Sequence, residues 1–542
     1  MTPTNEMQVS PLTDAPEPGA ADAPDRAALP EDQDQSLRAP VLLLLLSSLL
    51  WLVAGSLAYV MAFVKLHAPG MMAGAAWLTY GRLHPAATNA LLYGFASQAG
   101  LAIALWMLAR LGRAPLAFPS FAIVGWFVWN LAVPLGIGGI LLGDTTGFEW
   151  FEMPRYASPA LFAAYALIAA SALITLAKRE EPALYVSQWF LLAALFWFPW
   201  VWTVGHLLLA FHPLRGVMQA AVHGWAMNGV ATLWLTALSL AIIYYFIPKI
   251  TGAPLYSRGL AQLGFWTFAI CGAWGGLRAG TPLPAWVVSV SVAAGVSMIV
   301  PLVANAANWS HTLSGQRNQV MQSLPLQFIV AAAGSYVLTA FLGVLTSARG
   351  VSKFTGFTCV ATAQHVLLIF GVVGFAVGGA IYYLVPRLAQ TEFCCDKAPK
   401  IHFYGGLAGL GLATVGLVIG GLVQGAGLSD ASKTMIEIIK STKPWLQLSA
   451  AGLLVLTVAN GFLAVNFIGV LVKTTRRCVL ECVLPELRGS RRQEAQTSME
   501  SGLAHAGCCG LEKGLPETAL QPEPPRQPPP PALKPAKKRR RK

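Results

Sequence analysis

Histidine is the residue type in this sequence that could carry out chemistry inside an apolar environment. Eight of the nine histidines lie within or beside long apolar runs, at His67, His84, His206, His212, His223, His311, His365 and His402. A neutral imidazole is a suitable ligand for both iron and copper, and an ionisable residue inside a membrane span indicates a functional site. However, no two of these histidines stand four residues apart, and no carboxylate accompanies them within an apolar run. Each could therefore also be an ordinary polar residue at a helix end or between helices.

The cysteines do not add a metal-binding motif. The sequence contains eight cysteines but no CxxC pair and no CxxCH motif, which argues against a zinc ribbon and against a covalently attached c-type haem. Cys271 and Cys359 lie inside apolar runs, where we expect them to pack as small apolar residues.

The elements that must position the histidines are transmembrane helices. Hydrophobic residues make up 55% of the chain and charged residues only 11%. Many apolar runs exceed the roughly 20 residues that cross a bilayer. The sequence therefore predicts an all-α membrane protein with about twelve spans, at about 41–64, 86–110, 118–143, 158–177, 185–210, 217–247, 259–277, 284–306, 324–346, 359–386, 403–424 and 445–472.

The two ends of the chain differ in composition from this membrane domain. We expect residues 1–38 to form a disordered acidic tail, 39–474 the membrane domain, and 475–542 a disordered Pro-rich basic tail. An even number of spans places both tails on one side, and the distribution of Lys and Arg favours the cytoplasm. We therefore predict a multi-pass protein of the plasma (inner) membrane. Its partner is the lipid bilayer, and we expect no nucleic acid to bind. The acidic segment 144–156 then lies outside and is long enough to fold over the surface or to hold a partner.

Two helices are predicted to end in nearly the same sequence, Tyr244–Lys249 (YYFIPK) and Tyr382–Arg387 (YYLVPR). Each six-residue sequence begins with two tyrosines and ends with a proline and a cation. This order is typical of a helix that reaches the membrane interface, with tyrosines at the headgroups and a proline that stops the helix.

Several segments, in order along the chain, carry a resemblance to a known family. They are residues 81–85 (GRLHP), 88–90 (TNA), 244–249, 254–257 (PLYS), 265–266 (FW), Trp274, 284–286 (PAW) and 379–387. Together they resemble subunit I of the haem-copper oxidases, and most closely the C-type (cbb-type) cytochrome c oxidase. The resemblance covers about residues 41–390 and implies a haem-copper-oxidase subunit I-like bundle of twelve helices.

The resemblance also implies a set of cofactors and an activity. The family holds two b-type haems and one copper, takes electrons from cytochrome c in the respiratory chain, reduces oxygen and moves protons. A low-spin haem lies between two histidines, a high-spin haem binds one histidine, and copper binds three. The two haem ligands of the tenth helix are spaced i,i+2, which turns them about 200° apart.

At every expected ligand position this sequence has another residue. Counting from the shared segments, the second-helix haem ligand falls on Ala87, and the two tenth-helix haem ligands fall on Gln364 and Val366. The copper ligands fall on Asn228 in the sixth helix and on Arg278 and Ala279 in the seventh, and the redox tyrosine falls on Gly272. Ala and Val side chains have no ligating atom, and a guanidinium would repel copper.

Two histidines lie close to the substituted positions and are candidate haem ligands. His84 precedes Ala87 by three residues, and His365 stands between Gln364 and Val366. A one-residue shift, such as a local bulge, could bring His365 to a haem and rebuild one bis-histidine site with His84.

We therefore predict a cytochrome c oxidase subunit I-like protein that has lost the binuclear centre. It would be a pseudoenzyme with no catalytic residues and no metal ligands, and with at most one haem. Other oxidase-like subunits or a cytochrome c are its expected partners. One alternative is an active haem-containing oxidase or nitric oxide reductase relative with displaced ligands. A second alternative is a twelve-span transporter, although no inverted repeat is evident.

Overall fold

The computed structural model describes residues 31–277 and 281–478 of the chain. Contacts between residues divide the chain into a large unit, 1–475, and a second unit, 476–542. The predicted tails lie mostly outside the described residues. The helical region is somewhat longer than the predicted membrane domain, because the first helix begins at Glu31 and the last ends at Cys478.

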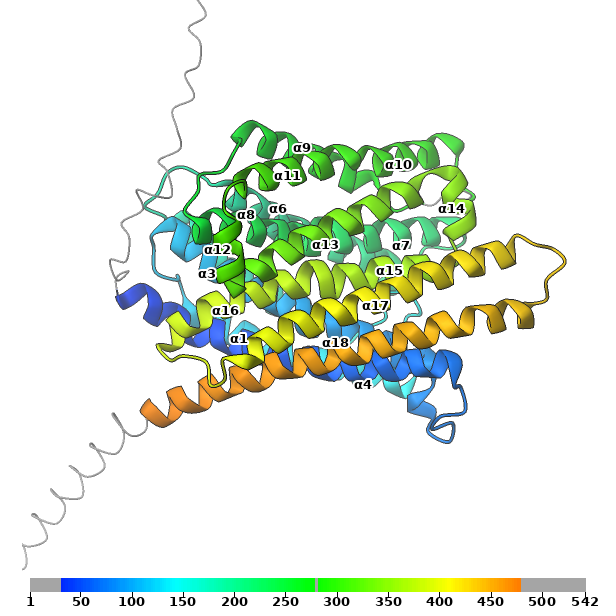
Figure 1. Cartoon of the computed structure of the whole chain (residues 1–542), viewed down its shortest axis with the longest axis horizontal. Helices are drawn as coiled ribbons and strands as arrows, with labels where there is room; N and C mark the ends of the chain where they lie inside the picture. Colours follow the sequence, from blue (N-terminus) through cyan, green and yellow to red (C-terminus); the bar gives the residue numbers. More distant parts are fainter. Residues whose placement is uncertain (1–30, 278–280, 479–542) are drawn as a thin grey trace, which may run out of the picture. The chain divides into compact units, whose positions relative to one another are not determined.

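The secondary structure of the described residues consists of helices (Figure 1). Four of the helical segments are π-helical. The first six spans consist of α1 Glu31–His67; α2 Tyr80–Asn89, η2 Ala90–Ser97 and α3 Gln98–Gly112; α4 Pro119–Leu142; α5 Ser158–Ala177; α6 Val186–His206 and η3 Leu207–Phe211; and α7 Val217–Gly229, η4 Val230–Thr236 and α8 Ala237–Thr251. The last six consist of α9 Arg258–Trp274; α10 Ala285–Ser297 and α11 Ile299–Thr312; α13 Leu324–Ser347; α15 Cys359–Val366, η5 Leu367–Gly374 and α16 Phe375–Ala389; α17 Lys397–Leu428; and α18 Met435–Cys478. Short helices η1 Ala76–Leu78, α12 Arg317–Gln322 and α14 Arg349–Thr355 connect them.

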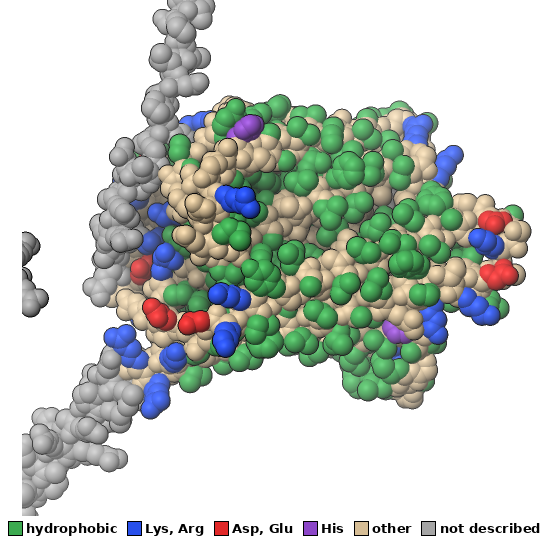
Figure 2. Space-filling view, viewed as in Figure 1, with side chains coloured by type: hydrophobic (Ala, Val, Ile, Leu, Met, Phe, Trp, Pro, Cys, Tyr) green, Lys and Arg blue, Asp and Glu red, His purple; other side chains and the backbone are tan. Residues whose placement is uncertain are grey.

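The prediction of an all-α membrane bundle is confirmed. Within the described residues, 11 helical segments are long and apolar enough to cross a membrane. The remaining expected span, 259–277, corresponds to α9, whose 17 residues fall just short of the about 20 that cross a bilayer. Hydrophobic side chains cover the middle of the face seen in Figure 2, and charged side chains gather at its two ends. A lipid-embedded bundle requires this distribution.

The second, sixth and tenth spans form the interior of the bundle. The most apolar stretches of these spans are 100%, 78% and 89% buried, which is more than in any other candidate span of the described residues. Each of the three contains one π-helical segment, namely η2, η4 and η5. Because π-helical turns are rare and often mark functional sites, the centre of the bundle is where a site is expected.

The two sequences that end in proline and a cation behave differently from the prediction. The helices continue past Pro248 and Pro386 and end at Thr251 and Ala389, so the prediction that the prolines stop them is wrong. A proline this close to a helix end removes one backbone hydrogen bond and leaves the rest of the last turn intact. The residue that follows each helix end, Gly252 or Gln390, has a left-handed backbone and caps the helix.

The tyrosines of these sequences lie against other helices. Tyr244 is 4% exposed and donates a hydrogen bond to Asn305 Oδ1 at 2.7 Å. The Tyr382 hydroxyl lies 3.1 Å from His402 Nδ1. These tyrosines therefore join helices inside the protein, where a buried hydroxyl needs a partner.

Helices α17 and α18 pack closely through glycines. A Cβ atom added at Gly409 would lie 2.6 Å from the amide nitrogen of Leu456. One added at Gly452 would collide with the amide nitrogen of Ala413. Small residues of this kind allow neighbouring membrane helices to approach backbone to backbone.

We predict that Gly452→Ala destabilises the protein by about 1–3 kcal/mol, because the added methyl forces α17 and α18 apart. Thermal unfolding of the detergent-solubilised protein measures the effect. Gly411→Ala is the matched control, since nothing lies within 4 Å of a Cβ at that position. The control should be neutral or slightly stabilising, and equal effects of the two substitutions would contradict the packing argument.

Candidate functional site

The two candidate haem ligands lie in the second and tenth spans. His84 belongs to α2, and its ring stacks on Tyr80 with ring centres 5.2 Å apart, while Tyr59 lies 5.4 Å from it. His365 belongs to α15, and its side chain is 18% exposed. Sequence reasoning placed both histidines beside the expected ligand positions, and in the structure both lie near Glu149.

The loop between α4 and α5, residues 143–157, reaches these histidines and is called here the α4–α5 loop. Glu149 Oε1 lies 3.4 Å from His365 Nδ1, close enough for an ion pair when the imidazole is protonated. The ring of Trp150 packs on the ring of His365 with centres 4.9 Å apart. His223 Nε2 of the sixth span donates a hydrogen bond to the backbone oxygen of Glu149 at 3.0 Å. The tip of the loop therefore occupies the space beside His365.

The α4–α5 loop is also fixed to the second span. Asn89 Nδ2 donates a hydrogen bond to Glu152 Oε2 at 2.7 Å, and the Tyr93 hydroxyl donates one to the backbone oxygen of Trp150 at 2.6 Å. Glu152 is only 5% exposed. A buried carboxylate is costly unless it is paired or protonated, so these contacts define a polar site between the loop and the second span.

The two loop carboxyls have opposite electrostatic environments. Burial raises the pKa of Glu152 to about 8; the charge of Glu149 adds to this effect, and the hydrogen bond from Asn89 opposes it. Partial burial would also raise the pKa of Glu149, but hydrogen bonding and charge from His365, with His84 and His223 nearby, bring it down to about 2. At neutral pH Glu149 is thus ionised and Glu152 carries a proton.

The expected haem-ligand positions hold side chains that have no ligating atom or are otherwise engaged. Ala87 and Val366 are buried, with exposures of 1% and 0%. Gln364 donates a hydrogen bond through Nε2 to Thr346 Oγ1 at 2.9 Å. The interior of the second and tenth spans is therefore built from apolar contacts and an interhelical hydrogen bond at these positions.

At the expected copper position, the sixth and seventh spans touch directly. Asn228 Nδ2 donates a hydrogen bond to the backbone oxygen of Gly272 at 2.8 Å. A Cβ atom at Gly224 would lie 2.7 Å from the backbone oxygen of Gly276, so the two backbones meet there. Gly276 also has a φ of +101°, which favours glycine. The other two expected copper positions, Arg278 and Ala279, lie outside the described residues.

The residues at the expected ligand positions do not fit the family's two haems and one copper. Among the side chains that the structure describes, no group of three or more His, Cys, Asp or Glu could hold a metal ion. His365, the remaining histidine of the tenth span, faces Glu149 and Trp150 of the protein itself. The direct contact between Asn228 and Gly272 joins the two helices that would have to surround a copper ion.

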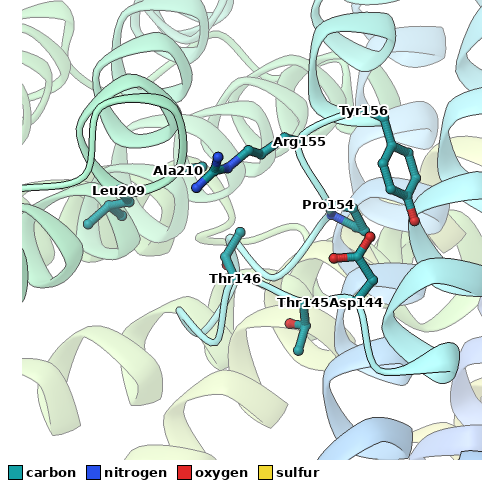
Figure 3. Close-up of a pocket in the computed structure, with 8 residues that line it drawn as sticks. All are labelled: Asp144, Thr145, Thr146, Pro154, Arg155, Tyr156, Leu209 and Ala210. Atoms are coloured by element: carbon teal, nitrogen blue, oxygen red, sulfur yellow. The ribbon is translucent and has the colours of Figure 1, made fainter.

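A separate pocket of about 450 Å³ lies at the surface beside the same loop (Figure 3). It is lined by Asp144, Thr145, Thr146, Pro154, Arg155, Tyr156, Leu209 and Ala210. In Figure 3 the Asp144 carboxylate lies next to Tyr156, and Arg155 extends towards Ala210. Neither candidate haem histidine lines this pocket, so it is distinct from the polar site at the tip of the loop.

Sequence reasoning missed Glu149 and Glu152 as members of the site. It considered carboxylates within the spans, and both residues lie in a loop. The acidic character and length of segment 144–156 were the available signals, and they indicated a loop folded over the surface. The loop instead enters the bundle because Trp150 and Phe151, at 0% and 1% exposure, are buried in it.

The fold and the site define a polytopic helical membrane protein whose interior is formed by its second, sixth and tenth spans. Residues 39–455 match the family model described as "Cytochrome C and Quinol oxidase polypeptide I". The match covers most of the chain, so the protein belongs to this family and is a cytochrome c oxidase subunit I-like membrane protein. The resemblance inferred from the sequence is thereby confirmed.

Individual relatives agree with this assignment. The chain is 28% identical over 440 residues to a cytochrome c oxidase subunit 1 homolog of Azorhizobium caulinodans, covering 76% of this chain and 78% of the relative. It is 26% identical over 324 residues to the Cbb3-type cytochrome c oxidase subunit CcoN1 of Stutzerimonas stutzeri, covering 58% and 68% of the two chains. A solved structure of a haem-copper terminal oxidase dimer has the same fold, with a TM-score of 0.63, 14% identity and coverage of 80% and 84%.

The raised pKa of Glu152 gives a prediction about stability. In the folded protein this carboxyl holds its proton up to about pH 8, against an ordinary value of 4.5. Unfolding releases that proton at any pH between the two values, so stability falls as the pH rises from about 4.5 to about 8 and then levels off. The Glu152→Gln protein should lack this decline. Melting temperatures of both proteins between about pH 5 and about pH 9 measure the difference, and parallel curves would contradict the assignment.

Proposed function

We propose that this protein is an oxidase-like membrane subunit without a binuclear haem-copper centre, which does not itself reduce oxygen. The hydrogen bond from Asn228 to the backbone of Gly272 carries the proposal. It fills the expected copper position with a direct contact between the sixth and seventh spans. The amide nitrogen is a donor with no lone pair for a metal, and the amide oxygen accepts a hydrogen bond from Thr232 Oγ1 at 3.4 Å.

The haem positions support the same conclusion. Ala87 and Val366 cannot ligate iron, and Gln364 uses its amide to bond Thr346. Three of the expected ligands on two spans are thus replaced by groups that stabilise contacts between helices. Such a subunit would act as a structural or assembly partner, or as a pathway for protons or small ligands.

One observation favours a second candidate function, an electron carrier that binds one haem through displaced ligands. The π-helical segment η5 lies between His365 and the Tyr382 segment used for counting. The expected ligand positions were counted back from Tyr382. If η5 contains one residue more than the same segment of the relatives, each position moves one residue earlier, and the second ligand of the tenth span falls on His365. One haem between His365 and His84 would then be the most that the site could hold.

We also propose that the protein lies in the plasma (inner) membrane with both tails in the cytoplasm. The number of spans is even when α9 is counted as the seventh, and this number and the distribution of Lys and Arg support the orientation. The names of the relatives suggest other oxidase subunits or a cytochrome c as partners. The α4–α5 loop would then lie on the outer side of the membrane.

A reduced-minus-oxidised absorption spectrum of the purified protein tests the proposal, together with a pyridine haemochrome assay and a copper measurement. We expect no haem band and no copper. Haem and copper together would refute the proposed function. One haem without copper would support the second candidate, and its band should then disappear in both His84→Ala and His365→Ala.

A further inference from the structure

We propose that residues 148–152 of the α4–α5 loop form a clamp that takes over the structural role of haem, by linking the second, sixth and tenth spans. This inference rests on the proposed function, because it concerns a subunit that has no haem at this position. The five residues are called the loop clamp.

The loop clamp contacts each of the three interior spans through different groups. It meets the tenth span where Glu149 lies 3.4 Å from His365, and the sixth span where His223 donates to the backbone oxygen of Glu149 at 3.0 Å. It meets the second span where Asn89 donates to Glu152 at 2.7 Å. A single segment therefore joins three helices that are far apart in the sequence.

The positions of these contacts coincide with the lost ligands. Asn89 follows Ala87 by two residues, and His365 directly precedes Val366. A haem held by ligands from two helices fixes those helices relative to each other, because metal binding is coupled to folding. Here the same regions of the second and tenth spans are fixed by Asn89 and His365 through the loop clamp.

Close contacts hold the loop clamp in place, and Trp150, Phe151 and Glu152 in it are buried. Trp150 has a φ of +71°, a costly conformation for a bulky residue that neighbouring contacts must hold in place. The Thr146 hydroxyl donates a hydrogen bond to the backbone oxygen of Phe151 at 2.6 Å. The ring of Phe151 packs so tightly on the fifth span that a Cβ at Gly205 would lie 2.7 Å from it. A loop that only covered the surface would not need these contacts.

The test is to produce the full chain in cells that make haem only when given δ-aminolevulinic acid, with and without this precursor. We expect wild type to accumulate to the same level and to melt at the same temperature in both cases. In the haem-free preparations, E149Q and W150A should melt at least about 3 °C lower than wild type. Chymotrypsin should also cleave them faster after Phe151. W150F should have a smaller effect, because it keeps an aromatic ring.

E181Q is the matched control for the acid-to-amide change. Glu181 lies outside the loop clamp, and its Oε2 forms a long ion pair with Arg113 Nη2 at 3.9 Å. It should melt and be cleaved like wild type.

The proposal is overturned if all three loop variants behave like wild type, or if wild type is lost or melts lower without haem. Haem and copper assays on the same samples keep the two ideas apart. Haem with copper in wild type refutes the proposed function, whereas haem-free wild type with unaffected variants refutes the loop clamp alone.

Discussion

This structure depends on one constraint, which is that every polar group inside the apolar bundle needs a hydrogen-bond partner. In the bilayer core no water satisfies a backbone or side-chain group, so the chain forms helices and pairs its remaining polar groups internally. Asn228 bonds the backbone of Gly272, Gln364 bonds Thr346, and Tyr244 bonds Asn305. Each of these bonds crosses between helices, so the polar residues also determine how the helices pack.

The same constraint applies to the residues at the expected ligand positions. Where the family has a histidine bound to metal, removal of the metal would leave a buried polar group without a partner, which is costly. This chain has apolar residues at Ala87 and Val366, and it pairs amides at Asn228 and Gln364 with groups of neighbouring helices. Under the proposed function, these residues belong to a bundle that packs without a cofactor.

The α4–α5 loop extends this logic to His365, the histidine that remains in the tenth span. Glu149 gives its imidazole a charged neighbour, and Trp150 covers its ring. Glu152 enters the interior as a protonated carboxyl bonded to Asn89. A loop connecting two outer helices thus becomes part of the interior, and the surface pocket of Figure 3 forms on its exposed side.

The sequence by itself determined the class of the molecule, most of its spans and its family. Apolar runs about as long as a bilayer is thick can form little else than membrane helices, and segments such as 81–85 keep their order along the chain. Only the tertiary structure decided how His365 is used. Its nearest carboxylate, Glu149, lies more than 200 residues earlier in the chain, so sequence spacing cannot relate the two. The structure also showed that the two helices end beyond Pro248 and Pro386, at left-handed capping residues. The prolines in the sequence did not indicate these ends.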